Sequence, residues 1–343
     1  MDGQNPNSSK PKGNLKSTKK TCGSYVFDSS MKTSISRSWR WGVMDTKFTF
    51  AFNICYLFDF SRNARAYIIG LGDNFMDTLV QDHRYLIIDQ FTKQAEPFAK
   101  KSIQFAREVF EKIQTLVHAN ENDMVLDVAS GTGSLAVEFA KICRHVTGTD
   151  ITPAMIKQAK ILQEMNMLNN INWDTGDITR KLPYASNSFS IVISKFSFHH
   201  LLNPLSVLIE MNRVCTIGGK IVIVDPTPPP KKAILYNQLE HLRDPSHVKA
   251  LTISEFDNLF RNAGIPILDR GFYRMKIGLD DQLHTSFLDP TNIEKIRLML
   301  IEDTKNDTLG LESYFEGNEI YFSYPNSIFV GQKASYLTCS MDP

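Results

Sequence analysis

The chain has 343 residues, of which 42% are apolar, enough for one large or two small domains around a hydrophobic core. Its 38 Lys and Arg residues nearly balance its 37 Asp and Glu residues, so no net charge favours nucleic acid or an anionic membrane as a partner. The five cysteines are widely spaced and never form a C-x-x-C pair, so they indicate neither a disulfide framework nor a metal site.

The N-terminal part of the chain gives no clear fold. Residues 1–24 are polar and rich in Ser, Asn, Lys, Pro and Gly, a composition that predicts disorder. The basic surplus of residues 1–40 resembles a mitochondrial leader, but its lysine-dominated composition favours a solvated tail, and we expect a cytoplasmic protein. Residues 41–82 are aromatic without helical or strand periodicity, and the apolar stretch 48–60 falls short of the ~20 residues of a transmembrane segment.

Periodicity begins at about residue 85. Near-helical spacing of apolar residues predicts leading helices up to residue 117. Buried strands then alternate with helices: strands are expected at 124–129, 145–150, 170–176, 188–196 and 218–226, and helices at 134–143, 153–166 and 205–215. This alternation indicates βαβ units with right-handed crossovers.

The C-terminal part repeats this rhythm more loosely. It predicts a helix at 252–264, a strand at 266–277, mainly helix at 281–306 and a last strand at 324–334. The expected fold is α/β and Rossmann-like, with about seven mostly parallel strands and helices on both faces. We expect an N-terminal extension at 1–84, the domain at 85–335 with lid segments at about 231–251 and 275–323, and a tail at 336–343.

The stretch DVASGTGSL, residues 127–135, follows the first of these strands and admits two kinds of ligand. Its G-x-G-x-x-A spacing is that of a dinucleotide-binding turn, yet a carboxylate at Asp127 would repel a pyrophosphate there. A ligand that carries an ammonium and a sulfonium but no phosphate would be attracted instead. Asp150, at the end of the second strand, suits either ligand, because both contain an adenosine ribose.

Five motifs in order resemble class I S-adenosylmethionine-dependent methyltransferases. They are DVASGTG, TGTDITPAMI, GDITRKLPYASNSFSIVIS, FHHLLNP and EMNRVCTIGGK. Within that class they resemble the small-molecule branch that includes the ubiquinone/menaquinone C-methyltransferases, over residues 85–335. The resemblance implies S-adenosyl-L-methionine as cofactor and a small-molecule methyl acceptor, such as a quinol or phenol, with no metal.

The resemblance also implies roles for individual residues of a cofactor site. Asp127 and the loop formed by Ala129, Ser130, Gly131, Thr132 and Gly133 would line the methionine half of the cofactor. Asp150 would bind the ribose hydroxyls and Ile151 would pack on the adenine. Asp177 would accept from the adenine amino group, with the backbone of Ile178 donating beside it. Ser194 would lie near the cofactor's ammonium, and Phe91 would close the pocket.

Acceptor-side candidates follow the fourth and fifth strands. His199, His200 and Asp225 would face the acceptor, where a histidine could remove a proton; a structural role in fixing the loop is the alternative. In the segment 236–252, Arg243 and His247 could contact a polar group of the substrate, and His247 could serve as a base; a capped and salt-bridged helix end is the alternative.

Two other classes of function remain open at this point. The G-x-G-x-x-A spacing keeps an NAD(P)-dependent oxidoreductase as a rival, which Asp127 weakens. A non-catalytic module with a surviving cofactor pocket is the second rival.

Overall fold

The computed structural model describes residues 73–335. The expectations for residues 1–72 and for the tail at 336–343 lie outside the described residues. None of the helices in the described range combines the length and the apolar character that a membrane span needs.

The described chain alternates helices and strands. The helices are α4 (Asp73–Val117), α5 (Ser134–Ala140), α6 (Pro153–Met165), α7 (Pro204–Val214), α8 (Ala233–Arg243), α9 (Ile253–Asn262), α10 (Leu279–Ser286) and α11 (Pro290–Asn306), with a 3₁₀ turn η2 (Phe198–His200). The strands are β1 (Met124–Val128), β2 (His145–Asp150), β3 (Ile171–Thr175), β4 (Phe189–Lys195), β5 (Cys215–Pro226), β6 (Ile267–Gly278), β7 (Tyr314–Glu316) and β8 (Glu319–Gln332).

One eight-stranded sheet organises the fold, in the order β3-β2-β1-β4-β5-β8-β6, with β7 paired to β8. Strands β1 to β5 pair in parallel, and β8 runs antiparallel to β5, β6 and β7. The predicted Rossmann-like α/β fold is therefore confirmed. The strand order reverses between β1 and β4, so the carboxyl ends of these strands form the edge where ligands bind in such sheets.

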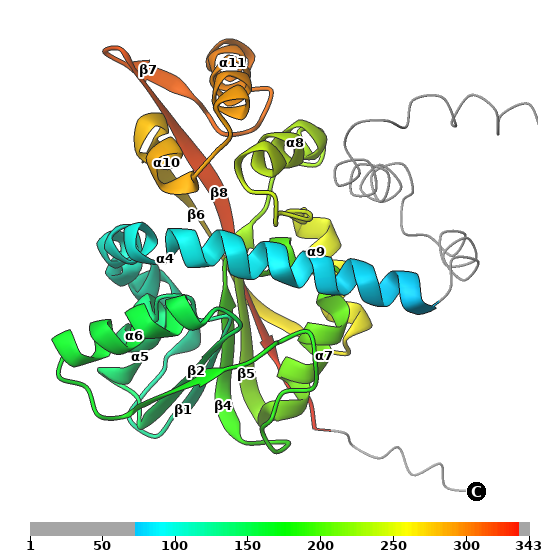
Figure 1. The fold of residues 1–343 in the computed structure, drawn as a ribbon. Helices are drawn as coiled ribbons and strands as arrows, with labels where there is room; N and C mark the ends of the chain where they lie inside the picture. Colours follow the sequence, from blue (N-terminus) through cyan, green and yellow to red (C-terminus); the bar gives the residue numbers. More distant parts are fainter. Residues whose placement is uncertain (1–72, 336–343) are drawn as a thin grey trace, which may run out of the picture. The chain divides into compact units, whose positions relative to one another are not determined.

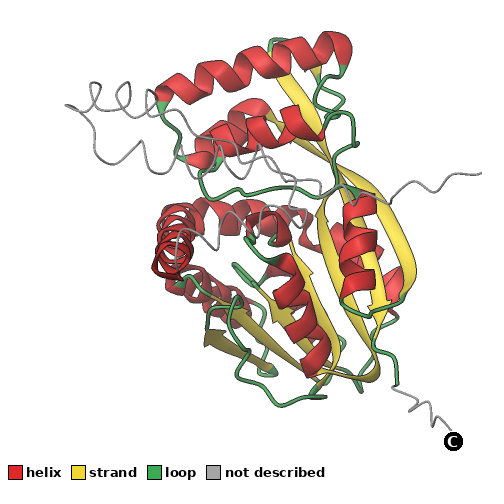
Figure 2. Ribbon diagram, turned by 90° about the vertical axis from the view of Figure 1, so that its right-hand side faces the viewer, coloured by secondary structure: helices red, strands yellow, loops and turns green. Residues whose placement is uncertain are grey.

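Helices cover both faces of the sheet (Figures 1 and 2). On one face, α4, α5 and α6 bury a core that includes Ile113, Phe139 and Leu162. On the other face, α7 and α9 bury Leu208 and Phe256. Burial on both faces explains the apolar runs in the central strands β1, β4 and β5, whereas the edge strand β3 is largely exposed.

Helix ends follow the local chemistry that the sequence indicated. Pro153 occupies the first turn of α6 after the N-cap Thr152. Thr252 and Glu255 form a capping box at the start of α9, in which each side chain accepts from the other's backbone N–H. Gly264, with φ of 69°, follows the end of α9.

The leading segment differs from expectation. α4 is one helix that continues through Pro97, and it starts at Asp73, before the boundary expected at residue 85. In Figure 1 it crosses between the sheet below and α8, α10 and α11 above. The position of α4 over the strand ends makes it one wall of the candidate site.

The region above α4 was the least well predicted. It contains α8, α10, α11 and the far ends of β6 and β8, which share a third core around Tyr236, Leu300 and Phe322. The last strand begins at Glu319 instead of residue 324, because it forms a hairpin with β7. All three residues of β7 are exposed, so β7 has no apolar alternation to reveal it.

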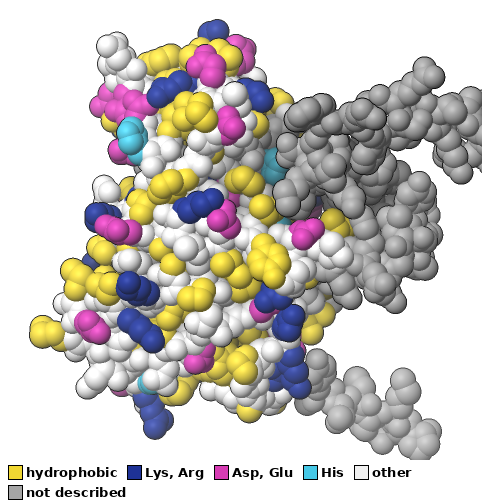
Figure 3. Space-filling view, in the orientation of Figure 1, with side chains coloured by type: hydrophobic (Ala, Val, Ile, Leu, Met, Phe, Trp, Pro, Cys, Tyr) yellow, Lys and Arg dark blue, Asp and Glu magenta, His cyan; other side chains and the backbone are white. Residues whose placement is uncertain are grey.

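The surface reflects the balanced composition. On the face drawn in Figure 3, basic and acidic side chains are interspersed with apolar ones over most of the area.

Candidate active site

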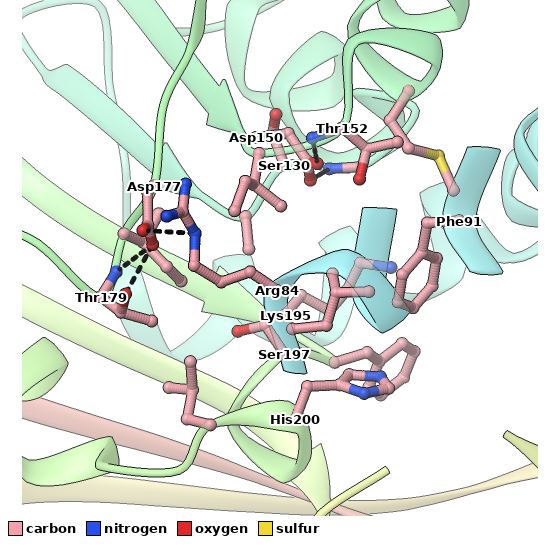
Figure 4. Close-up of a pocket in the computed structure, with 18 of the residues that line it drawn as sticks. Arg84, Phe91, Ser130, Asp150, Thr152, Asp177, Thr179, Lys195, Ser197 and His200 are labelled. Atoms are coloured by element: carbon pink, nitrogen blue, oxygen red, sulfur yellow. Dashed lines mark hydrogen bonds and ion pairs between the residues drawn. The ribbon is translucent and has the colours of Figure 1, made fainter. Parts of the chain in front are cut away.

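A cavity of about 330 Å³ lies at the carboxyl ends of β1, β2 and β4, under α4. Its walls are the loops after β1, β2, β3 and β4 together with one side of α4 (Figure 4). Apolar side chains from α4 and from the segment after η2 line it beside a small set of charged groups. The charged lining groups are Arg84, Asp127, Asp150, Asp177 and Lys195.

The glycine loop forms the floor of the cavity. Gly131 has φ of 53°, and a Cβ at this position would meet no atom within 4 Å, so its backbone faces open space. Gly133 has φ of 74° and starts α5; a Cβ there would collide with the Trp173 ring. Ala129, Ser130 and Thr132 line the cavity, whereas Gly133 does not, and its role is to let α5 pack closely on β3.

Asp150 ties the loops after β1 and β2 together. Its two oxygens accept from the backbone N–H of Gly131 at 2.9 Å and of Thr152 at 2.8 Å. Burial raises the pKa of Asp150, while these two hydrogen bonds oppose the rise. The carboxylate is therefore held rigidly at the end of β2, beside Ile151, which also lines the cavity.

Asp127 and Lys195 bring opposite charges into the cavity. Asp127 is 2% exposed, and its Oδ2 has no hydrogen-bond partner. Burial raises the pKa of Asp127 to about 7, and the Lys195 ammonium opposes that shift. Burial lowers the pKa of Lys195, and Asp127 opposes it in turn. The pair is thus attractive, but its atoms do not approach within ion-pair distance.

Asp177 is engaged by other side chains. Its Oδ1 accepts from the backbone N–H and hydroxyl of Thr179 at 2.9 and 2.6 Å. Its Oδ2 lies 3.0 Å from Nε of Arg84 on α4 and 3.4 Å from Nε of Arg180. The Arg84 pair links α4 to the loop after β3 (Figure 4). Ile178 lines the cavity next to it.

Phe91 and His200 meet on the side of the cavity formed by α4 and η2. Their rings pack edge to face with centroids 5.2 Å apart. Nδ1 of His200 lies 3.0 Å from the carbonyl oxygen of Ser246, and because a carbonyl only accepts, Nδ1 carries the hydrogen. Burial and the neighbouring His199 lower the pKa of His200, so its Nε2 is unprotonated at neutral pH.

Ser194 does not line the cavity. It is fully buried, and its Oγ donates to the carbonyl oxygen of Val128 at 2.6 Å and contacts Oγ of Ser197 at 2.5 Å. Alternation along β4 turns Ser194 and Lys195 to opposite faces of the sheet, and Lys195, together with Ser197 just after the strand, lines the cavity instead. The predicted position near the ligand therefore falls to those two residues.

Four predicted acceptor-side residues lie behind the cavity wall. His199 is paired through Nδ1 with Oδ1 of Asp225 at 3.0 Å. His247 contacts Oδ1 of Asn237 through Nε2 at 2.7 Å and packs 5.4 Å from the His199 ring. Arg243 forms a two-pronged pair with Glu240. Only His200 of the predicted histidines reaches the cavity itself.

The pKa values of His199 and His247 are shifted in opposite directions. Burial alone lowers the pKa of His199, but the Asp225 carboxylate outweighs it and leaves that pKa above its usual value. Burial and the charges of the other histidines hold the pKa of His247 well below its usual value. One histidine, His199, is thus kept basic by its carboxylate, as in sites where an acid orients a general base.

The sequence reading missed Lys195 and Arg84. Lys195 ends an otherwise apolar buried strand, which is the same signal that singled out Asp127 and Asp150. Arg84 lies on a stretch of α4 before the first recognised periodicity, and only the packing of α4 against the β3 loop brings it to the site.

The strand order, the glycine loop and the acids at successive strand ends define an α/β domain that binds a nucleoside-containing ligand. Residues 119–264 match a family model that is described as a methyltransferase domain. The uncharacterized methyltransferase YcgJ of Bacillus subtilis is 26% identical over 172 residues, which cover 50% of this chain and 68% of YcgJ. The solved structure of YcgJ has a TM-score of 0.62 at 21% identity, covering 67% of this chain and 99% of that one, and shows the same fold.

A second relative is 38% identical over 109 residues: the ubiquinone/menaquinone biosynthesis C-methyltransferase UbiE of Bdellovibrio bacteriovorus. This match covers 31% of the present chain and 46% of the relative, so it spans less than half of that protein. Taken together, the matched domain at residues 119–264 and these relatives indicate a methyltransferase domain of the class I S-adenosylmethionine-dependent type, whose cofactor is S-adenosyl-L-methionine.

The cavity fits that cofactor. Apart from Arg84 Nε and Asp177 Oδ2, which form an ion pair, and Thr152 Oγ1, which lies beside the Asp150 carboxylate, two polar atoms of the lining are buried without a hydrogen-bond partner: Asp127 Oδ2 and Ser130 Oγ. Buried polar atoms are normally paired, so these are positions where a ligand supplies the partner. An ammonium and ribose hydroxyls provide such partners, whereas a pyrophosphate would face the Asp127 carboxylate.

Proposed function

We propose that this chain transfers a methyl group from S-adenosylmethionine to a small-molecule acceptor, using the cavity under α4. The observation that carries the proposal is the unpaired carboxylate oxygen of Asp127 beside the glycine loop. In this proposal Asp127 attracts the cationic methionine half of the cofactor, and the backbone of residues 129–132 lies alongside that half.

The nucleoside half extends toward the ends of β2 and β3. Asp150 uses the remaining lone pairs of its fixed carboxylate to accept from the ribose hydroxyls, and Ile151 packs on the adenine. Asp177 reaches the adenine amino group only if Arg84 yields part of that carboxylate, since Thr179 already occupies the other oxygen. The backbone of Ile178 donates to the same ring, and Phe91 closes the cavity from α4.

The cofactor supplies an electrophilic methyl group on its sulfonium, so the protein's work is alignment and the exclusion of water. Phe91, Phe98 and Leu201 are part of the apolar lining that excludes water. His200 presents an unprotonated Nε2 with a low pKa, which makes it a hydrogen-bond acceptor for the incoming group and a poor proton acceptor.

His199 is the better candidate for a base. Asp225 holds its Nδ1, and the raised pKa suits proton removal from a weakly acidic hydroxyl. Because His199 lies behind His200, with ring centroids 4.2 Å apart, it acts only on an acceptor that reaches past His200. His247 and Arg243, which pair with other buried side chains, hold this cluster in place instead of touching the acceptor.

The acceptor class that fits this lining is a flat apolar ring with a hydroxyl, such as a quinol or phenol. The apolar and aromatic side chains accommodate the ring, and His200 accepts from its hydroxyl. The name of the UbiE relative, a C-methyltransferase of quinone biosynthesis, supports the same class.

Calorimetric titration with S-adenosylmethionine and with NADH tests the proposal. Micromolar binding of S-adenosylmethionine without a response to NADH supports it, and the reverse pattern indicates the oxidoreductase. Formation of S-adenosylhomocysteine is then measured with a panel of quinols, phenols and amines. Binding without turnover on the whole panel indicates the non-catalytic module.

A separate experiment tests whether His199 acts as a general base. His199→Gln is expected to lower kcat on a quinol or phenol by about 100-fold and to remove the acidic limb of the pH–rate profile, because general acid–base catalysis contributes about 10²–10⁴-fold. An unchanged profile in a folded variant would leave His199 with a structural role only.

A further inference from the structure

Lys195 is a cationic side chain of the cavity to which the proposed function gives no role. It ends β4 and lines the cavity with Asp127 and Ser197. Its Nζ lies 4.6 Å from the centroid of the Phe196 ring. Within residues 73–335, no hydrogen bond and no ion pair within 4 Å involves this ammonium. Lys195 is half-buried, and an ammonium that is partly removed from water without an anionic partner is costly, so its position favours an anionic ligand group.

The other charged groups of the cavity do not supply that partner. Asp150 is held by two backbone donors and Asp177 by Thr179 and two arginines. Asp127 attracts Lys195 but lies beyond ion-pair distance. Arg84 is already paired with Asp177, so Lys195 is the cation free to meet a ligand anion.

Asp127 and Lys195 therefore bring a carboxylate and an ammonium into the same cavity without pairing with each other. A ligand group that carries an ammonium and a carboxylate on one carbon satisfies both at once. We propose that Lys195 binds the carboxylate of the cofactor's methionine while Asp127 faces the ammonium. This inference rests on the proposed function. It makes Lys195 the residue by which the site distinguishes a cofactor that carries both the ammonium and the carboxylate from one that lacks the carboxylate.

The inference has a consequence for ligand selection. A cofactor analogue without the carboxylate keeps the ammonium, sulfonium and nucleoside but leaves Lys195 unpaired. Because a hydrogen bond to a charged group contributes about 1.5–3 kcal/mol, the protein should prefer S-adenosylmethionine over its decarboxylated analogue by about 10- to 100-fold.

Binding of both ligands to the wild type and to Lys195→Met tests the inference by calorimetry. Lys195→Met is expected to weaken S-adenosylmethionine at least tenfold and to leave the decarboxylated analogue within about threefold, so that the preference disappears. Lys195→Arg keeps a cation and is expected to retain most of the preference. Arg84→Met removes the other cation of the cavity and is the matched control, with the preference unchanged.

The outcomes separate this inference from the proposed function. If Lys195→Met weakens both ligands equally, Lys195 only supports Asp127 and the inference is wrong. A variant that keeps the wild-type preference also overturns it, with the proposed function intact. If the wild type binds neither ligand, the proposed function itself fails, and the inference fails with it. Melting curves of Lys195→Arg and Lys195→Met show whether each variant is folded.

Discussion

The pH dependence of cofactor affinity should report the ionisation of Asp127. This carboxyl is buried at the end of β1 with one unpaired oxygen, and burial raises its pKa to about 7. A ligand with an ammonium and a sulfonium binds the ionised form. Below pH 7 the protein must therefore release a proton to bind, and affinity falls as the pH falls.

The magnitude follows from the pKa. For one group with a pKa of about 7, the ionised fraction is ~0.9 at pH 8 and ~0.1 at pH 6. The apparent Kd for S-adenosylmethionine should therefore rise about tenfold from pH 8 to pH 6, which corresponds to about 1.4 kcal/mol. Asp127→Asn cannot ionise, so it should bind weakly at both pH values and lose this dependence.

Calorimetry at pH 6, 7 and 8, in buffers with different ionisation enthalpies, measures both the affinity and the protons released. The ligand's own amino group titrates in the experiments on either protein, so the difference between wild type and Asp127→Asn isolates the carboxyl. Equal pH slopes in the two proteins would refute the assignment of the proton to Asp127.

The same carboxyl affects the stability of the ligand-free protein, with a sign that can be checked. Its folded pKa lies above its unfolded value of 3.8, so the folded state binds the extra proton between pH 4 and 7. Stability from this group is therefore present at low pH and lost as the pH rises toward 7, by up to about 4 kcal/mol. Asp127→Asn should lack this loss in denaturant titrations at pH 5 and pH 8.

Three further changes test other contacts. Asp150→Ala should weaken S-adenosylmethionine at least tenfold in the same titration, and unchanged affinity in a folded variant would mean that the ribose lies elsewhere. Arg84→Ala breaks the pair with Asp177 and should raise affinity about two- to fivefold by freeing that carboxylate for the adenine; weaker binding would show that Arg84 itself contacts the cofactor. Thr252→Ala removes the capping box of α9 and should cost about 1 kcal/mol of unfolding free energy by urea titration, and an unchanged unfolding free energy would show that the box does not stabilise the helix.

Most of the fold could be predicted because the strands and helices of the central sheet have strong, short-range signals. Apolar runs indicated β1, β4 and β5, the alternation of short segments indicated β2 and β3, and cap residues such as Thr152 and Thr252 marked helix starts. The hairpin of β7 and β8 left a weaker signal, the turn residues EGN at 316–318, because its exposed side chains carry no apolar pattern. The start of α4 had no periodic signal at all.

The residues of the site that lie at the ends of strands could be predicted from the sequence. Asp127, Asp150 and Asp177 follow successive strands, and all three line the cavity. Which residues lie at the surface of the cavity and which lie behind it depends on how η2 and α8 pack, and the sequence contains no local sign of that. Asp225 ends β5 as Asp150 ends β2, yet it is fully buried against His199.

The charges of the cavity also bear on turnover. Its lining carries three carboxylates and the two cations Arg84 and Lys195, a formal charge of −1 when Asp127 is ionised. S-adenosylmethionine carries a net charge of +1, and the product loses the sulfonium and becomes neutral. The attraction that Asp127 provides therefore weakens once the methyl group has left, because the ammonium is then the ligand's only positive charge. An ionised Asp127 thus favours the methyl donor over the spent cofactor, whereas a protonated one discriminates less, and pH should change this preference through the same carboxyl that controls affinity.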